Sequence, residues 1–147
     1  MKAVLMSVSH EAVKLIASGR KKAVVQKKCA RDICLPFTLY FYEKRGQLKH
    51  KPKYGYTSYR YDGRGVVVGE CVCVCITRIE SESLFGIAEI ADCMTAKEFC
   101  DYLGGKTGYI FRFVDVKMYD QPIPLEEFGK RTPPQSWCFV EERTGEK

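Results

Sequence analysis

The chain has 147 residues, of which 46% are apolar, so it can bury the core of one folded domain, and global disorder is not expected. Its net charge is +6 and is unevenly spread, because residues 20–64 carry 13 Lys and Arg against 3 Asp and Glu. The longest apolar stretch, 66–76, is interrupted by Gly69 and Glu70 and is too short for a membrane helix, and no secretory leader is visible. We therefore expect a single cytoplasmic domain over 1–147 with no membrane partner.

The first forty residues predict a strand, a helix and two further strands. A short strand is expected over 3–7, and Ser9 is placed to cap a helix over about 10–18. Gly19 stands where a left-handed residue commonly ends a helix. A second strand is expected within 22–28, and a third over 37–42 after the break at Pro36.

Residues 44–65 form a basic stretch rich in tyrosine and glycine, without clear periodicity, which predicts a long loop. Interleaved tyrosine and basic side chains can stack on nucleobases and neutralise phosphates together. The alternative is that the tyrosines simply pack against the body of the protein. The sequence leaves both interpretations open.

The run 66–79 gives the strongest strand signal in the chain. Within it Cys71, Cys73 and Cys75 alternate with apolar residues, which places all three thiols on one face of a strand. The chain has eight cysteines but no C-x-x-C pair, and we expect them to be reduced. We therefore interpret them as small buried residues and expect no metal and no cofactor.

The second half predicts one more helix and two more strands. Residues 81–92 are ambiguous, whereas Thr95 and Glu98 form a capping box that opens a helix to about Leu103. Strands are expected over 108–119 and, after two prolines, up to Val140, with a turn or one-turn helix over 122–128 between them. Because the strands are mostly consecutive, the fold class is α+β, mainly β: a small mixed barrel of about six strands with two peripheral helices.

Three segments carry a resemblance to a known family. They are the turn Ser18-Gly19-Arg20-Lys21-Lys22, the strand start Val68-Gly69-Glu70, and the stretch 119–128 followed by Pro133-Pro134-Gln135-Ser136-Trp137-Cys138. In this order and spacing the chain resembles the ASCH family of the PUA-like superfamily, and in particular small bacterial or phage-associated members. The resemblance implies a β-barrel with a cleft between the first helix and the barrel mouth, and a role linked to RNA.

The resemblance also bears on catalysis. One ASCH branch hydrolyses acetylcytidine with a lysine in the G-x-K turn, a threonine and a glutamate, and another is associated with ribonuclease activity. By this resemblance Lys21 matches the turn lysine and Glu70 matches the glutamate of the V-G-E strand start found in many members, and these two are the candidate catalytic residues. However, Val24 stands where the family has Glu or Thr, and Gln26 stands where it has Arg. Since valine cannot act as an acid, base or nucleophile, the sequence favours a binding module over an enzyme.

Our leading hypothesis is an RNA- or nucleotide-binding module with a basic cleft. A small hydrolase acting on a modified nucleoside or on RNA, and a protein-interaction module such as a phage accessory factor, are the alternatives. The side chains expected at phosphates or bases are Lys21, Lys22, Lys27, Lys28, Tyr54, Tyr56, Arg60 and Arg64.

The side chains expected to line the cleft are Ser9, Arg112, Gln135, Ser136 and Trp137. Several of these positions also have structural interpretations. For Trp137 we favour packing in the core or in the cleft wall. For Glu70 we favour a structural ion pair with Lys21 or Arg112 over a catalytic role.

Overall fold

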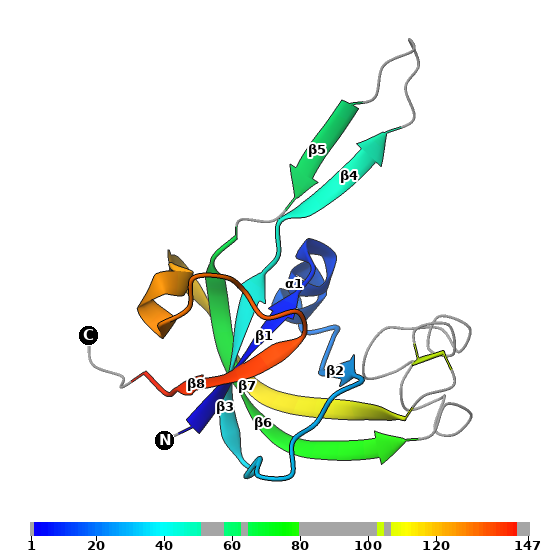
Figure 1. The fold of residues 1–147 in the computed structure, drawn as a ribbon, viewed down its shortest axis with the longest axis vertical. Helices are drawn as coiled ribbons and strands as arrows, with labels where there is room; N and C mark the ends of the chain where they lie inside the picture. Colours follow the sequence, from blue (N-terminus) through cyan, green and yellow to red (C-terminus); the bar gives the residue numbers. More distant parts are fainter. Residues whose placement is uncertain (1, 51–57, 63–64, 80–102, 105–106, 144–147) are drawn as a thin grey trace.

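The computed structural model describes residues 2–50, 58–62, 65–79, 103–104 and 107–143, and for 46–50 and 58–62 only the backbone. Its centre is a six-stranded mixed sheet (Figure 1) with the order β2-β7-β6-β3-β1-β8. The strands of this sheet are β1 (Lys2–Val8), β2 (Ala23–Gln26), β3 (Phe37–Glu43), β6 (Val67–Ile79), β7 (Gly108–Ile123) and β8 (Trp137–Glu141). Strand β1 runs parallel to β3 and antiparallel to β8, and the other ladders are antiparallel.

The expected six-stranded mixed sheet is confirmed, but it is not a closed barrel. Among the described residues β2 and β8 are the two edges, and no ladder joins them. Side-chain contacts link the two edges instead. Trp137 of β8 donates from Nε1 to the Lys28 carbonyl at 2.9 Å, and Lys28 donates from Nζ to the Trp137 carbonyl at 2.8 Å. The chain after β2 therefore occupies the gap that a closing ladder would need.

The helix α1 (His10–Ala17) begins and ends where the sequence predicts. Ser9 accepts a hydrogen bond on its side chain from the Ala12 amide at 3.1 Å, which satisfies one of the free donors of the first turn. Gly19 has φ of +81°, the left-handed conformation that glycine adopts without steric cost. Val13 and Ile16 are buried, so this face of α1 packs on the sheet.

The two faces of the sheet carry different apolar clusters. The larger cluster, under α1, is built from alternate residues of the strands and includes Phe41, Phe111 and Trp137. On the opposite face a second cluster packs beneath the short helix η1 (Leu125–Phe128), the one-turn helix that the sequence predicts. None of the described helices is long and apolar enough to cross a bilayer.

The prediction of a loop over 44–65 is wrong in part. It contains a two-stranded ribbon of β4 (Gly46–His50) and β5 (Ser58–Asp62), which projects from the six-stranded sheet in Figure 1. These strands pair only with each other, so their sequence is not required to carry the alternating apolar pattern of a core strand. The helix expected from the Thr95–Glu98 box and the ambiguous segment 81–92 lie outside the described residues, apart from Leu103.

The three cysteines of β6 do not share one environment. Cys71 and Cys73 are buried in the larger cluster, whereas Cys75 is half-buried and lies outside it. Between these positions β6 has one residue more than β7, because Cys73 pairs with Phe113 and Cys75 pairs with Arg112. This bulge at Val74 interrupts the alternation on which the sequence prediction depends. Among the described residues no group of His, Cys, Asp and Glu is arranged to hold a metal.

Candidate functional site

A cleft of about 500 Å³ lies between the C-terminal end of α1 and β7. We call it the Lys21 cleft. Lys21 and Lys22 lie at its wall, and neither a carboxylate nor an imidazole is among the described side chains that line it. The complete lining is Ile16, Ala17, Ser18, Gly19, Lys21, Lys22, Phe113, Val114, Val116 and Met118.

Backbone hydrogen bonds fix the turn that carries the two lysines. The amides of Arg20 and Lys21 both donate to the Leu15 carbonyl, at 3.0 and 3.1 Å, so the chain folds back under the last turn of α1. The Phe113 amide donates to the Lys22 carbonyl at 3.1 Å and joins this turn to β7. As a result the Lys21 side chain is buried, with 8% exposed, while Lys22 is exposed. The basic residues also follow the negative end of the helix dipole, where positive charge is favoured.

The β7 side of the Lys21 cleft is apolar and partly open to solvent. Val114 and Val116 are 45% and 38% exposed, although both belong to a central strand of the sheet. Between the pairs Val72–Val114 and Glu70–Lys117, β7 has one residue more than β6, and Asp115 adopts a left-handed φ of 57° there. This bulge redirects β7 and leaves the two valines on the surface beside the lysines.

The lining of the Lys21 cleft combines positive charge with an apolar wall. Ammonium groups attract anions, and an exposed apolar wall can contact a planar or aliphatic group. Among the described lining side chains, the groups best able to accept a proton are the amines of Lys21 and Lys22.

Solved structures resemble this chain over nearly its whole length. The crystal structure of ASCH from Zymomonas mobilis matches with a TM-score of 0.71 at 18% identity, covering 95% of this chain and 88% of that chain. Its tyrosine-to-phenylalanine variant matches with a TM-score of 0.70 at 18% identity, over 97% and 92% of the two chains. Its serine-to-alanine variant gives 0.66 at 19% identity, over 95% and 89%. The chain has the ASCH fold. The sequence matches no protein-family model and no curated protein.

The match confirms the ASCH fold expected from the sequence motifs, although the sheet is open and not a closed barrel. The structure places Val24 in the core. Val24 is 8% exposed and belongs to the larger cluster, and Gln26 is also buried. An apolar side chain thus fills the position at which the family motif led us to expect Glu or Thr.

The structure does not bring Lys21 and Glu70 together. Lys21 lines the cleft on the α1 face of the sheet, near Phe113 of the larger cluster. Glu70 lies on the opposite face, where Tyr119 donates its hydroxyl to Oε1 of Glu70 at 2.5 Å. Burial, and then the bond to Glu70, raise the pKa of Tyr119. Glu70 therefore pairs with Tyr119 rather than with Lys21 or Arg112, and the expected catalytic pair is not assembled.

The other expected cleft residues have separate positions. Ser9 caps α1, and Trp137 is 2% exposed within the larger cluster, so neither side chain faces the Lys21 cleft. Gln135 is exposed, and the Ser136 carbonyl accepts from the Ser7 amide at 2.9 Å. Arg112 is half-buried on β7 opposite Ala23 and makes no ion pair within the described part of the chain.

The expected phosphate contacts are also dispersed. Lys27 and Lys28 are exposed, but Lys28 is held to Trp137 by its ammonium group, which lies 4.6 Å from the centre of the indole ring. Arg60 belongs to β5, where only the backbone is described. Tyr54, Tyr56 and Arg64 lie outside the described residues. Among the members of this set whose side chains the structure describes, Lys21 and Lys22 line one cleft.

Sequence reasoning missed a buried carboxylate. Glu43 is 1% exposed and accepts a hydrogen bond from Nδ1 of His10. Two signals were present: a glutamate at the end of an apolar strand, and a histidine directly after the helix cap. Neither signal predicts that the two residues are in contact, because they meet only when β1 pairs with β3.

Proposed function

We propose that this chain binds single-stranded RNA or a nucleotide in the Lys21 cleft. The observation that supports this function best is the meeting of two lysines and an exposed apolar wall in one hollow of about 500 Å³. That volume lies within the usual range for small-molecule sites, and a nucleotide carries both a phosphate and a flat base.

In this proposal the two parts of a nucleotide meet different walls. The exposed ammonium group of Lys22 contacts a phosphate, while Lys21 adds positive charge from the buried side of the turn. A base lies against Val114 and Val116, which lose exposed apolar area when it binds. The excess of basic residues over 20–64 supplies long-range attraction for a polyanion.

The geometry gives the hydrolase hypothesis no comparable support. The Lys21 cleft lacks a described carboxylate or imidazole, and Glu70 is bonded to Tyr119 on the other face of the sheet. We therefore propose binding without turnover.

The test is fluorescence anisotropy of a labelled single-stranded RNA over a salt series. Each phosphate contact to a single strand contributes a slope of about 0.7 to the dependence of log affinity on log salt. Lys22→Ala should lower this slope by roughly that amount, whereas Arg131→Ala, an exposed position outside the cleft, should not. Binding that is absent or independent of salt would overturn the proposal.

A pair of valines gives a second, uncharged comparison. Val114 lines the Lys21 cleft and Val74 does not, yet both are exposed β-strand residues, at 45% and 44%. Val114→Ser should weaken RNA binding by roughly threefold through lost apolar contact, and Val74→Ser should leave it unchanged. Equal effects of the two variants would show that the base does not lie on β7.

A further inference from the structure

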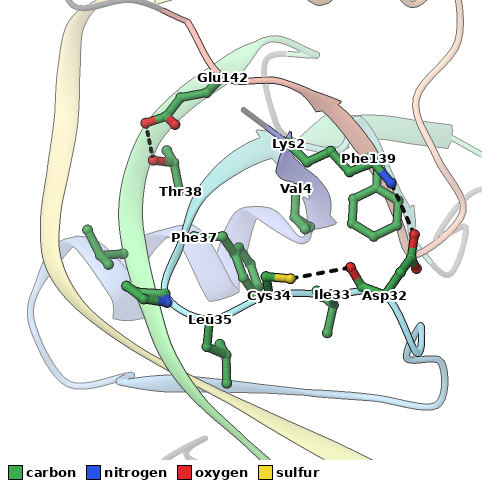
Figure 2. A pocket seen from close by; sticks show the side chains of 12 residues that line it. Lys2, Val4, Asp32, Ile33, Cys34, Leu35, Phe37, Thr38, Phe139 and Glu142 are labelled. Atoms are coloured by element: carbon green, nitrogen blue, oxygen red, sulfur yellow. Dashed lines mark hydrogen bonds and ion pairs between the residues drawn. The ribbon is translucent and has the colours of Figure 1, made fainter.

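A second hollow, of about 620 Å³, shares no residue with the Lys21 cleft (Figure 2). We call it the Phe139 pocket. Side chains from β1, β3, β6, the end of β8 and the segment before β3 converge on it. It is lined by Lys2, Val4, Asp32, Ile33, Cys34, Leu35, Pro36, Phe37, Thr38, Val72, Phe139 and Glu142.

The body of the Phe139 pocket is apolar. Val4 and Phe37 are buried parts of the larger cluster, and Phe139 packs edge-on against Trp137 with ring centres 5.3 Å apart. Leu35 stands at the opening with 44% of its side chain exposed. Two aromatic rings and several aliphatic side chains therefore face one space, which favours an apolar ligand with a flat group.

The rim of the Phe139 pocket carries two polar contacts on opposite sides, as Figure 2 shows. On one side Lys2 donates from Nζ to Oδ2 of Asp32 at 3.0 Å, and this bond lowers the pKa of Asp32. On the other side Thr38 donates from Oγ1 to Oε2 of Glu142 at 2.8 Å.

These contacts leave the rim with one negative charge in excess. The charges of Lys2 and Asp32 compensate each other, and the Lys2 ammonium also lies 4.6 Å from the centre of the Phe139 ring. Glu142 faces no cation among the described residues, and its Oε1 accepts no hydrogen bond there. The free carboxylate oxygen thus borders an apolar hollow.

We propose that the Phe139 pocket binds a small cationic amphiphile, namely an amine carried by an aromatic or branched apolar body. The apolar body fills the space between Phe37 and Phe139, and the ammonium group pairs with Glu142. An acid of the same shape is disfavoured, because it brings a second negative charge to Glu142. This proposal is independent of RNA binding in the Lys21 cleft.

The test compares phenylbutylamine, phenylbutanol and phenylbutyrate, which share one apolar body and differ in charge. Trp137 is the only tryptophan of the chain and touches Phe139, so its emission reports occupancy of the pocket. The rate of alkylation at Cys34, which lines the pocket and is exposed, gives a second readout by mass spectrometry. The amine should change both signals saturably and bind tightest, and the acid should bind weakest.

Two substitutions separate the charge from the cavity. Glu142→Gln keeps an acceptor for Thr38 and should weaken the amine roughly threefold, as expected for an exposed ion pair, without changing the alcohol. Glu126→Gln, on the exposed side of η1 and outside the pocket, is the matched control and should change neither. Val72→Trp should fill the hollow and abolish binding of all three compounds.

Three results would overturn the proposal. The first is that none of the three compounds changes either signal saturably up to about 10 mM. The second is tighter binding of the acid than of the amine. The third is an unchanged affinity for the amine in a folded Val72→Trp protein. Because Lys22 lies in the other cleft, Lys22→Ala should leave amine binding unchanged while it weakens RNA binding.

Discussion

Nδ1 of His10 donates a hydrogen bond to Oε2 of Glu43, so the first residue of α1 is tied to the last residue of β3. The backbone of Glu43 is held as well, since its amide donates to the Val66 carbonyl at 3.0 Å and its carbonyl accepts from the Gly65 amide at 3.0 Å. One buried residue thus joins the start of the helix to the strands beneath it. This anchor sets the position of α1, and with it the wall of the Lys21 cleft.

Removing this anchor should destabilise the protein. Glu43→Ala leaves the imidazole of His10 without its acceptor and opens a cavity, so we expect a loss of about 2 kcal/mol in the free energy of unfolding. Glu11→Ala, on the exposed side of the same helical turn, should cost less than about 0.5 kcal/mol. Urea unfolding followed by Trp137 emission measures both changes.

A double-mutant cycle with His10→Ala isolates the bond itself. We expect a coupling free energy of about 1 kcal/mol between the two substitutions, because the residues share one hydrogen bond. Strict additivity would show that Glu43 acts through its other contacts.

The core should weaken in alkali. Burial raises the pKa of Cys73 from 9.0 to about 12, and burial also raises the pKa of Cys71. Above pH 9 the unfolded thiols ionise while the folded thiols stay protonated, so the free energy of unfolding falls as pH rises. Each thiol contributes about 1.4 kcal/mol per pH unit to this fall.

Urea unfolding of the reduced protein between about pH 8 and pH 11 measures this slope. Cys73→Ala should reduce this pH slope by the contribution of one thiol, whatever effect the substitution has on stability at neutral pH. Cys34→Ala, at an exposed position, is the control and should leave the slope as it is. An equal slope in the unsubstituted protein, Cys73→Ala and Cys34→Ala would contradict the raised pKa of Cys73.

Restoring the threonine of the acetylcytidine-hydrolysing branch should not restore its chemistry. Val24→Thr places a hydroxyl in the larger apolar cluster, which should cost about 1–2 kcal/mol of stability. No turnover of acetylcytidine should follow, because no described carboxylate lines the Lys21 cleft, and the candidate Glu70 is bonded to Tyr119 on the opposite face of the sheet. Chromatographic detection of released cytidine checks this prediction, and Lys21→Ala in the same background identifies any contaminating hydrolase.

Gly69 holds β6 and β7 in register beside the Lys21 cleft. A Cβ atom at Gly69 would lie 2.7 Å from the Lys117 carbonyl oxygen, and Gly69 pairs with Met118, which lines the cleft. Gly69→Ala should therefore cost about 2 kcal/mol, because backbone must move. It should also weaken RNA binding, since Met118 moves with β7.

Gly108→Ala provides the comparison for this substitution. The added methyl at Gly108 would meet only the side chain of Leu103, at 2.8 Å, and that side chain can rotate away. We expect less than half the loss of stability seen at Gly69, with RNA affinity unchanged. A larger loss at Gly108 than at Gly69 would contradict this account.

The parts of the fold that the sequence predicts are those with local causes. Ser9 and Gly19 determine the ends of α1 through hydrogen bonding and backbone freedom, and both act within four residues. The apolar run of β6 predicts a buried strand for a similar reason. The β4–β5 ribbon was missed because strands that pair only with each other need no alternating apolar pattern.

The candidate site was only partly predictable, because its geometry depends on bulges. Lys21 was placed correctly at the turn after α1, where the glycine and the basic residues are adjacent in sequence. The alternation of β6 predicts that Glu70 lies opposite Cys71 and Cys73, as it does. It does not predict that Lys21 lies on the cysteine side, because the face on which α1 packs depends on residues far away in the sequence. The lining of the Phe139 pocket comes from four separate stretches of the chain, so no local sequence pattern predicts it.

The reciprocal contacts between Lys28 and Trp137 have a consequence for how the chain folds during synthesis. These residues are 109 positions apart in the sequence. In addition, β1 lies between β3 and β8 in the sheet, so both of its edges are paired only when β8 is present. An emerging chain that has already made β3, β6 and β7 still exposes one side of β1 and lacks the indole that fills the core. Closure of the core must therefore wait until β8 has left the ribosome, and until then the nascent protein presents an unpaired strand edge to chaperones.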